Sequence, residues 1–335
     1  MEYRHFEPLG RQLSRLILGT GHFHDAVERQ SFEVLDRWLE SGGNSLDTAH
    51  FYRGGETERL LGRWLEARGC REQVLLITKG AHPVQGFTPR VTPTAIKADL
   101  GESLERLRTD FIDIFLLHRD DPTQPVGPLL EALNEHLVAG RIRSFGASNW
   151  TTRRLDEAAE YATANGMAGL ACSSPYLSLA SQNLAPWPGC VSAADPASLR
   201  WYQERQMPLL AWSSQAHGFF SCGADKTCDG DREMERVYYN SVNWKRHERV
   251  SATSAERGCD NTALALAWVL AQPLPVHALI GPRNLAQLAK SLEALKIALS
   301  PEDVRWLAWG EELPDDEPDS AASRSEAETP SHQSV

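Results

Sequence analysis

The regular alternation of short apolar runs with amphipathic helical stretches most constrains what this chain can fold into. The apolar runs lie at residues 16–18, 44–46, 74–77, 112–117, 142–147, 168–172, 208–212 and 276–280. Each is followed by a stretch with apolar residues at helical spacing, such as Phe32, Leu35 and Leu39 after the first run. Eight such strand-then-helix units predict a single-domain α/β fold, the (β/α)8 or TIM barrel.

The alternative to a barrel is a doubly wound open sheet. Such a sheet would bind a dinucleotide at a glycine-rich turn after its first strand. The turn in this chain, formed by Gly19, Thr20 and Gly21, lacks the third glycine of that fingerprint. We therefore favour the barrel and keep the open sheet as the second interpretation.

The charge of the chain is concentrated at its C-terminal end. The formal net charge is −11, and residues 311–335 hold eight acids against one arginine. This segment is rich in Ser, Ala and Pro and too poor in apolar residues to form a core, so we predict a disordered acidic tail after a barrel domain at residues 1–310. The remaining body is mildly acidic and has no basic stripe to bind nucleic acid or an anionic membrane.

Targeting and cysteine patterns favour a cytoplasmic protein. The longest apolar run, residues 263–271, is about half as long as a membrane-spanning helix, and the N-terminal residues have no apolar signal-peptide core. The six cysteines include no Cys-x-x-Cys pair, so we expect reduced thiols and no metal site. The alternative to free thiols is that Cys222 and Cys228 pair and close a loop or bind a metal.

Four polar residues stand at or just beyond the C-terminal ends of three consecutive predicted strands: Asp47, Tyr52, Lys79 and His118. Each has an ordinary interpretation on its own, as a helix cap, a cover of the barrel mouth, a solvated charge or a core histidine. In a barrel, however, the C-terminal ends of the strands meet at one rim, where catalytic residues lie. Together the four residues therefore predict a catalytic site.

These residues belong to a longer set of motifs. The motifs are LDTAHFY at 46–52, ITK at 77–79, SLERL at 103–107, DIFLLH at 113–118, GRIRSFGASN at 140–149 and IGPRN at 280–284. In these motifs the chain resembles the aldo-keto reductases, and the resemblance covers about residues 13–295. It implies a TIM barrel that binds NADPH and reduces a carbonyl compound by hydride transfer.

The resemblance also implies a role for each of the four polar residues. Tyr52 would be the general acid that protonates the carbonyl oxygen. Because a free tyrosine has a pKa near 10, the ammonium of Lys79 would lower that pKa, with Asp47 holding Lys79 charged and in place. His118 would orient the carbonyl and assist the proton relay, and NADPH would supply the hydride.

For the nicotinamide end of the cofactor, the resemblance implies four contacts. Ser148 and Asn149 match the pair that holds the carboxamide. Trp212 replaces the usual stacking tyrosine, and an indole stacks on a nicotinamide ring at least as well. Ser173 stands where many members have a glutamine, so the sequence departs from the family pattern at this contact.

For the phosphate and adenosine end, Ser213 begins the segment that wraps the pyrophosphate in the family. Gly281 and Arg283 open the helix after the last strand, a natural position for an anion, and Arg283 would bind the 2′-phosphate with its guanidinium fork. Gln287 would reach the adenine, whereas the usual Glu-Asn pair is absent at residues 290–291.

Substrate contacts are expected from Phe23, Phe51, Arg119 and Trp150, which lie just beyond strand ends. The polar residues nearby suit a hydroxylated or sugar-like carbonyl compound. The leading hypothesis is thus an NADPH-dependent reductase of an aldehyde or ketone, with the same chemistry run as a sugar or polyol dehydrogenase as a variant. Two other classes stay open: a redox-sensing module that binds NADP(H) without significant turnover, and a lyase or isomerase in which Lys79 forms a Schiff base. The sequence holds no signal for an oligomeric state.

Overall fold

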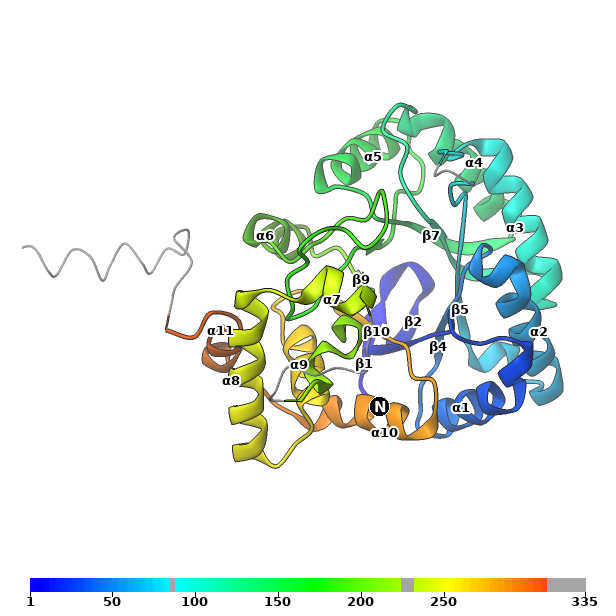
Figure 1. The fold of residues 1–335 in the computed structure, drawn as a ribbon. Helices are drawn as coiled ribbons and strands as arrows, with labels where there is room; N and C mark the ends of the chain where they lie inside the picture. Colours follow the sequence, from blue (N-terminus) through cyan, green and yellow to red (C-terminus); the bar gives the residue numbers. More distant parts are fainter. Residues whose placement is uncertain (85–87, 224–231, 312–335) are drawn as a thin grey trace, which may run out of the picture.

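The apolar runs form parallel strands that close into a barrel inside a ring of helices (Figure 1). The computed structural model describes residues 1–84, 88–223 and 232–311. The strands, in the order of the chain, are β3 (Leu16–Gly19), β4 (Ser45–Asp47), β5 (Leu75–Gly80), β6 (Ile112–Leu117), β7 (Ile142–Ser148), β8 (Ser173–Ser174), β9 (Leu209–Ala211) and β10 (Val276–Ile280). The predicted (β/α)8 barrel is confirmed, and the open sheet is wrong because β10 pairs with β3 and closes the circle.

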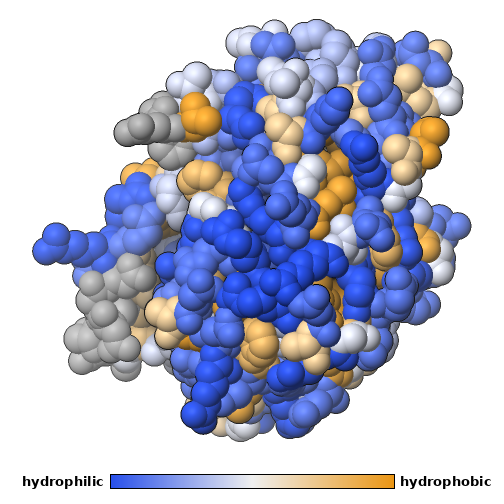
Figure 2. Space-filling view, turned by 90° about the vertical axis from the view of Figure 1, so that its right-hand side faces the viewer, coloured by the Kyte–Doolittle hydropathy of each residue, from blue (hydrophilic) through white to orange (hydrophobic). Residues whose placement is uncertain are grey.

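Helices follow the strands and cover the outside of the barrel (Figure 1). They are α1 (Glu28–Glu40), α2 (Glu56–Arg68), α3 (Pro93–Leu107), α4 (Val126–Val138), α5 (Thr152–Ala164), α6 (Pro196–Arg205), α7 (Arg232–Tyr238), α8 (Ser241–Arg257), α9 (Asn261–Leu270), α10 (Leu285–Glu293) and α11 (Pro301–Trp309). The start of α3 follows from its sequence, because the Thr92 side chain accepts a hydrogen bond from the backbone of Ala95 and Pro93 takes the first helical position. Figure 2 shows that hydrophilic residues dominate the side of the barrel on which α2 and α3 lie.

A hairpin that the sequence did not predict precedes the barrel. It is formed by β1 (Tyr3–Phe6) and β2 (Arg11–Ser14), which pair antiparallel. Phe6 and Leu13 are almost fully buried and belong to the apolar cluster that fills the barrel interior. Burying a side chain of this size stabilises the fold by about 1.5–3 kcal/mol, so the hairpin is part of the hydrophobic core.

The alternation of side chains along each strand decides which residues reach the mouth. On β5, Leu75 and Ile77 belong to the interior cluster, whereas Leu76 packs on the outer, helix-facing side. The next inward position after Ile77 is Lys79. On β6 the same two-residue period leads from the interior Leu116 to His118. An apolar floor therefore lies directly below the polar residues at the C-terminal rim.

Three boundaries differ from the predictions or lie outside the described residues. The sixth strand begins one residue after the predicted run 168–172, because its pairing with β7 starts at Ser173. Residues 312–335 of the predicted acidic tail and residue 228 of the Cys222–Cys228 pair lie outside the described residues. Within the described ranges no helix is long and apolar enough to cross a membrane. The same ranges contain no cluster of His, Cys, Asp and Glu able to hold a metal ion.

Candidate active site

The structure brings Asp47, Lys79 and Tyr52 into contact at the barrel mouth. The ammonium Nζ of Lys79 donates to Asp47 Oδ1 at 2.6 Å, to the backbone carbonyl of Thr48 at 2.8 Å and to Tyr52 Oη at 3.4 Å. The side chains of Asp47 and Lys79 are only 3% and 4% exposed. A buried ammonium therefore faces the phenol oxygen and is held there by a carboxylate.

The turn that carries Tyr52 is braced from the neighbouring helix. Tyr52 opens a short 3-10 turn that ends at Gly55, whose φ of 85° lies in the left-handed region. A Cβ on Gly55 would lie 2.5 Å from the guanidinium of Arg106, and that guanidinium donates to the backbone carbonyl of His50 at 3.1 Å. The SLERL motif thus has a structural role, since its arginine fixes the loop that positions Tyr52.

The electrostatics of this group differ in one respect from the sequence-based expectation. Burial opposes the ammonium of Lys79, but the charges of Asp47 and Tyr52 outweigh burial and raise the pKa of Lys79. For Tyr52 the balance goes the other way: removal of water raises its pKa above 10, although Lys79 and Arg119 both oppose that rise. Lys79 thus limits the increase in the pKa of Tyr52 but does not bring it below the ordinary value.

His118 completes the predicted set as a neutral imidazole. Its ring lies 5.8 Å from that of Tyr52 and 4.6 Å from that of His82. Burial, reinforced by the nearby charges of Lys79 and Arg119, holds the pKa of His118 well below 6.5. Its Nδ1 is buried and has no partner within the described structure. A neutral ring can donate a hydrogen bond to a carbonyl without bringing a second cation to Tyr52.

Three of the residues predicted for the nicotinamide end lie in one hydrogen-bonded group. The amide nitrogen of Asn149 donates to Ser148 Oγ at 2.8 Å, and its amide oxygen accepts from the indole of Trp212 at 3.2 Å. The same amide nitrogen lies 3.4 Å from the backbone carbonyl of His118. Asn149 thus connects the backbone of His118 to the indole of Trp212.

Ser173 does not join this group. It pairs with Ala147 and Leu209, whose side chains pack on the helix-facing side of the barrel. Its hydroxyl accepts a hydrogen bond from Tyr202 of α6 at 2.8 Å. A serine side chain is too short to reach the mouth from this position, which differs from the nicotinamide contact that the resemblance implied.

Three of the four residues predicted for the phosphate end, Gly281, Arg283 and Gln287, lie where β10 leads into α10. Arg283 is exposed, and its backbone N–H donates to Gln287 Oε1 at 2.7 Å. Gly281 lies close to His22, because an added Cβ would be 3.8 Å from the imidazole. Ser213 starts the loop after β9 with a φ of 50°. Gly281, Arg283 and Gln287 therefore lie around the start of one helix, where backbone N–H groups favour an anion.

One further arginine, Arg53, and two imidazoles, His22 and His217, which no sequence motif connects to the cofactor, lie in the same region. Partial burial, together with the neighbouring Arg283, His217 and Arg53, lowers the pKa of His22. These side chains come from three different loops, so no local motif reveals the group. The positive charges of Arg283 and Arg53 fit the phosphates of a dinucleotide such as NADP(H).

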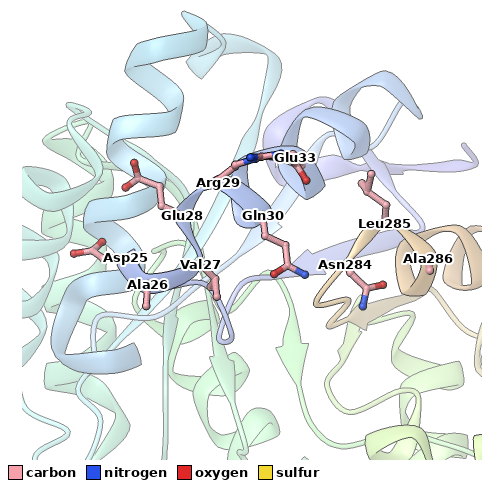
Figure 3. Close-up of a pocket in the computed structure, with 10 residues that line it drawn as sticks. All are labelled: Asp25, Ala26, Val27, Glu28, Arg29, Gln30, Glu33, Asn284, Leu285 and Ala286. Carbon is pink, nitrogen blue, oxygen red and sulfur yellow. Dashed lines mark hydrogen bonds and ion pairs between the residues drawn. The ribbon is translucent and has the colours of Figure 1, made fainter.

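A surface cavity of about 720 Å³ adjoins this region between the starts of α1 and α10 (Figure 3). The side chain of Gln30 donates to the backbone carbonyl of Arg283 at 2.8 Å across its edge. Three carboxylates, Asp25, Glu28 and Glu33, line its α1 side. That acidic side does not suit a phosphate, so an anion is better placed on the α10 side.

The predicted substrate residues divide into two kinds. Phe23 and Trp150 are 2% and 1% exposed and pack in the hydrophobic core, so their contact with a substrate stays a prediction. Phe51 is 53% exposed and stacks on His82 with ring centroids 3.9 Å apart. On another side of the mouth, the exposed Trp187 lies 6.4 Å from the ring of Trp212. His82 and Trp187 thus add aromatic surface that the predicted set does not contain.

Comparisons with known proteins agree with a barrel-type oxidoreductase built on this geometry. The model of the Aldo/keto reductase family matches residues 15–308, and the chain belongs to this family and is an oxidoreductase. It is 30% identical to the uncharacterized oxidoreductase YrpG of Bacillus subtilis, over 92% of this chain and 95% of that protein. It is 26% identical to the norsolorinic acid reductase stcV of Emericella nidulans, over 90% and 79% of the two chains. The crystal structure of an aldo/keto reductase from Klebsiella pneumoniae in complex with NADP and acetate superposes with a TM-score of 0.69 at 25% identity, covering 89% of this chain and 91% of that one.

Proposed function

We propose that this oxidoreductase uses NADPH to reduce an aldehyde or ketone to the alcohol, with Tyr52 as the general acid. The observation that carries the proposal is the buried ammonium of Lys79, 2.6 Å from Asp47 and 3.4 Å from Tyr52 Oη. The Klebsiella structure contains NADP and the Emericella relative is a reductase, and both agree with this cofactor and this direction.

The proton transfer follows from the arrangement of the chain's own residues. NADPH, when bound, supplies a hydride to the carbonyl carbon. Negative charge then develops on the carbonyl oxygen, and Tyr52 gives its hydroxyl proton to that oxygen while the O–H bond of the phenol breaks. The Lys79 ammonium stabilises the resulting phenolate, and Asp47 keeps that ammonium in place. The neutral His118 orients the carbonyl by a hydrogen bond.

The cofactor would lie between two groups of residues described above. Trp212 offers its indole face to the nicotinamide ring, and Ser148 and Asn149 lie beside it for the carboxamide. Arg283 would bind the 2′-phosphate and Gln287 the adenine end. Only NADPH carries the 2′-phosphate, so a contact with this group distinguishes NADPH from NADH, and a planar guanidinium suits the phosphate.

Two alternatives are weaker on structural grounds. A Schiff base on Lys79 needs a neutral amine, whereas the carboxylate of Asp47 stabilises the ammonium and the pKa of Lys79 is raised. A redox-sensing module that only binds NADP(H) does not need the buried ammonium of Lys79 beside the phenol of Tyr52. The same chemistry run in reverse would make a sugar or polyol dehydrogenase, and it uses the same residues.

The test is Tyr52→Phe, with turnover measured on a panel of aldehydes and ketones and NADPH affinity measured by quenching of tryptophan fluorescence. Loss of the general acid should lower kcat by about 10²–10⁴-fold with little change in the Kd for NADPH. Tyr161→Phe is the matched control, since Tyr161 lies on α5 and bonds Glu131 on the surface. Turnover of Tyr52→Phe equal to that of the control would contradict the proposed mechanism. NADPH binding without turnover by the unmodified protein would favour the sensing module.

A further inference from the structure

A buried cation lies next to the catalytic group without a carboxylate to balance it. Arg119 directly follows His118 and is 6% exposed. One guanidinium nitrogen donates to the backbone carbonyl of His118 at 2.8 Å, and another lies 3.5 Å from the sulfur of Cys190. Its Nε is buried without a partner. No carboxylate of the described residues lies within ion-pair distance of this guanidinium.

Other buried arginines in the described structure are better satisfied. Arg154, equally buried, pairs with Asp120 at 3.2 Å and with Glu157 at 3.0 Å. Arg246 has no carboxylate either, but its guanidinium donates to two backbone carbonyls and to the hydroxyl of Ser181. A buried charge with unsatisfied donors is costly, so the arrangement around Arg119 is complete only when something else supplies an acceptor.

The surrounding charges show which sign that acceptor should have. Asp47 and Lys79 neutralise each other, and the lowered pKa of His118 leaves it uncharged. The nearest acid in the sequence, Asp120, is paired with Arg154. The mouth therefore keeps the full positive charge of Arg119, which also acts on Tyr52 and His82.

Arg119 is held in its place by one contact to its backbone and one to its side chain. The indole of Trp150 donates to the backbone carbonyl of Arg119 at 3.3 Å. The segment between β8 and α6 packs on the side chain, because a Cβ on Gly189 would lie 3.4 Å from Arg119 Cδ. A long side chain fixed in this way loses little further freedom when it binds a ligand.

We infer that the substrate is a carbonyl compound that also carries a carboxylate, and that Arg119 binds this carboxylate while the carbonyl lies at Tyr52 and His118. The inference rests on the proposed reductase function and names the substrate class of that same site. The free Nε and the neighbouring guanidinium nitrogen offer the two-pronged donor that a carboxylate accepts. The role that the sequence suggested for Arg119, a polar contact to a sugar-like hydroxyl, would leave its charge unbalanced.

The experiment compares two substrates that differ only in charge. We choose 4-carboxybenzaldehyde and its neutral amide, 4-carbamoylbenzaldehyde, because the Phe51–His82 stack and the Trp187–Trp212 pair offer aromatic surface at the mouth. The variants are Arg119→Gln, Arg119→Lys and the control Arg305→Gln, which removes an exposed arginine on α11. We expect the unmodified protein to prefer the acid. Arg119→Gln should reduce kcat/KM for the acid about 10- to 100-fold more than for the amide, with a smaller loss in Arg119→Lys.

A binding measurement keeps this test separate from the test of turnover. Benzoate should quench tryptophan fluorescence of the unmodified protein and of Arg305→Gln, and Arg119→Gln should abolish that binding. Equal losses for the acid and the amide, or a fall in NADPH affinity in Arg119→Gln, would overturn the inference and assign Arg119 to the fold or the cofactor. If the unmodified protein reduces the amide as well as the acid, the reductase function stands and the carboxylate inference fails. If neither aldehyde reacts but benzoate binds through Arg119, the anion site stands and the proposed function fails.

Discussion

Replacing Lys79 by methionine tests whether the buried pair in the mouth serves catalysis, the fold or both. The change keeps much of the side-chain volume and removes the ammonium. It leaves Asp47, whose side chain is 3% exposed, without its 2.6 Å partner. The other carboxylate oxygen, Oδ2, already has no hydrogen-bond partner in the described structure. The variant therefore contains an uncompensated carboxyl group above the apolar floor of the barrel.

The size of the effect follows from this burial. Removing one member of a buried ion pair lowers the free energy of unfolding by about 3–5 kcal/mol. For a domain of this size we expect a fall in Tm of about 5–8 °C. The double variant Asp47→Asn with Lys79→Met removes both charges, and replacing a whole buried pair by neutral groups is often close to neutral for stability. We therefore expect the double variant to recover most of the lost stability.

Turnover should not follow stability in this series. Both variants lack the ammonium that faces Tyr52 Oη, so both should reduce carbonyl compounds far more slowly than the unmodified protein. Urea unfolding followed by circular dichroism gives the stabilities, and NADPH oxidation gives the rates. If the single variant is as stable as the unmodified protein, the pair is not as desolvated as its geometry indicates. If the double variant regains activity, Lys79 has no part in the proton transfer.

Two further predictions concern the cofactor and the pH dependence of stability. Arg283→Ala should raise the Kd for NADPH about 10- to 100-fold and that for NADH far less, measured by tryptophan fluorescence; equal changes would mean that Arg283 does not contact the 2′-phosphate. Burial lowers the pKa of His277 to about 4. As the pH falls below 6.5, the imidazole of His277 therefore takes up a proton in the unfolded chain but not in the folded one. The free energy of unfolding should fall by up to about 3 kcal/mol between pH 6.5 and pH 4. In His277→Gln, urea titrations should show an acid-induced loss of stability that is smaller by a similar amount. The control His5→Gln, which replaces an exposed histidine, should behave as the unmodified protein. If the free energy of unfolding depends on pH in the same way in both variants, His277 is not the group responsible.

The barrel and the polar residues at its rim were predictable because both follow from local periodicity. Runs such as residues 112–117 are short, apolar and followed by a helical pattern, and eight repetitions leave few architectures. The two-residue period of a strand then places Lys79 and His118 on the inner side of β5 and β6, above Ile77 and Leu116. The position of Lys79 and His118 at the strand ends is thus a consequence of register, which a sequence records directly.

Other features depend on contacts between distant segments and were not predictable in this way. The hairpin β1–β2 has only Phe6 and Leu13 as large buried residues, a pattern too sparse to indicate strands. The direction of Ser173 depends on which side of β8 meets α6, and a strand of two residues has too little periodicity to show it. The pKa of Tyr52 was expected to fall because a lysine lies nearby, but the extent of desolvation, which raises it, is a property of the closed barrel.

The different surroundings of Arg119 and Asp120 show most directly why the charge balance of the mouth cannot be predicted from the sequence. The two residues are adjacent in the sequence and of opposite charge, which suggests an ion pair between them. Immediately after a strand, however, neighbouring side chains point to opposite sides. Asp120 consequently meets Arg154 at the start of α5, and Arg119 lies beside His118 with no acid to oppose it. The same alternation that places Lys79 and His118 in the mouth thus leaves a fixed positive charge beside them, and a substrate that carries a carboxylate would compensate it.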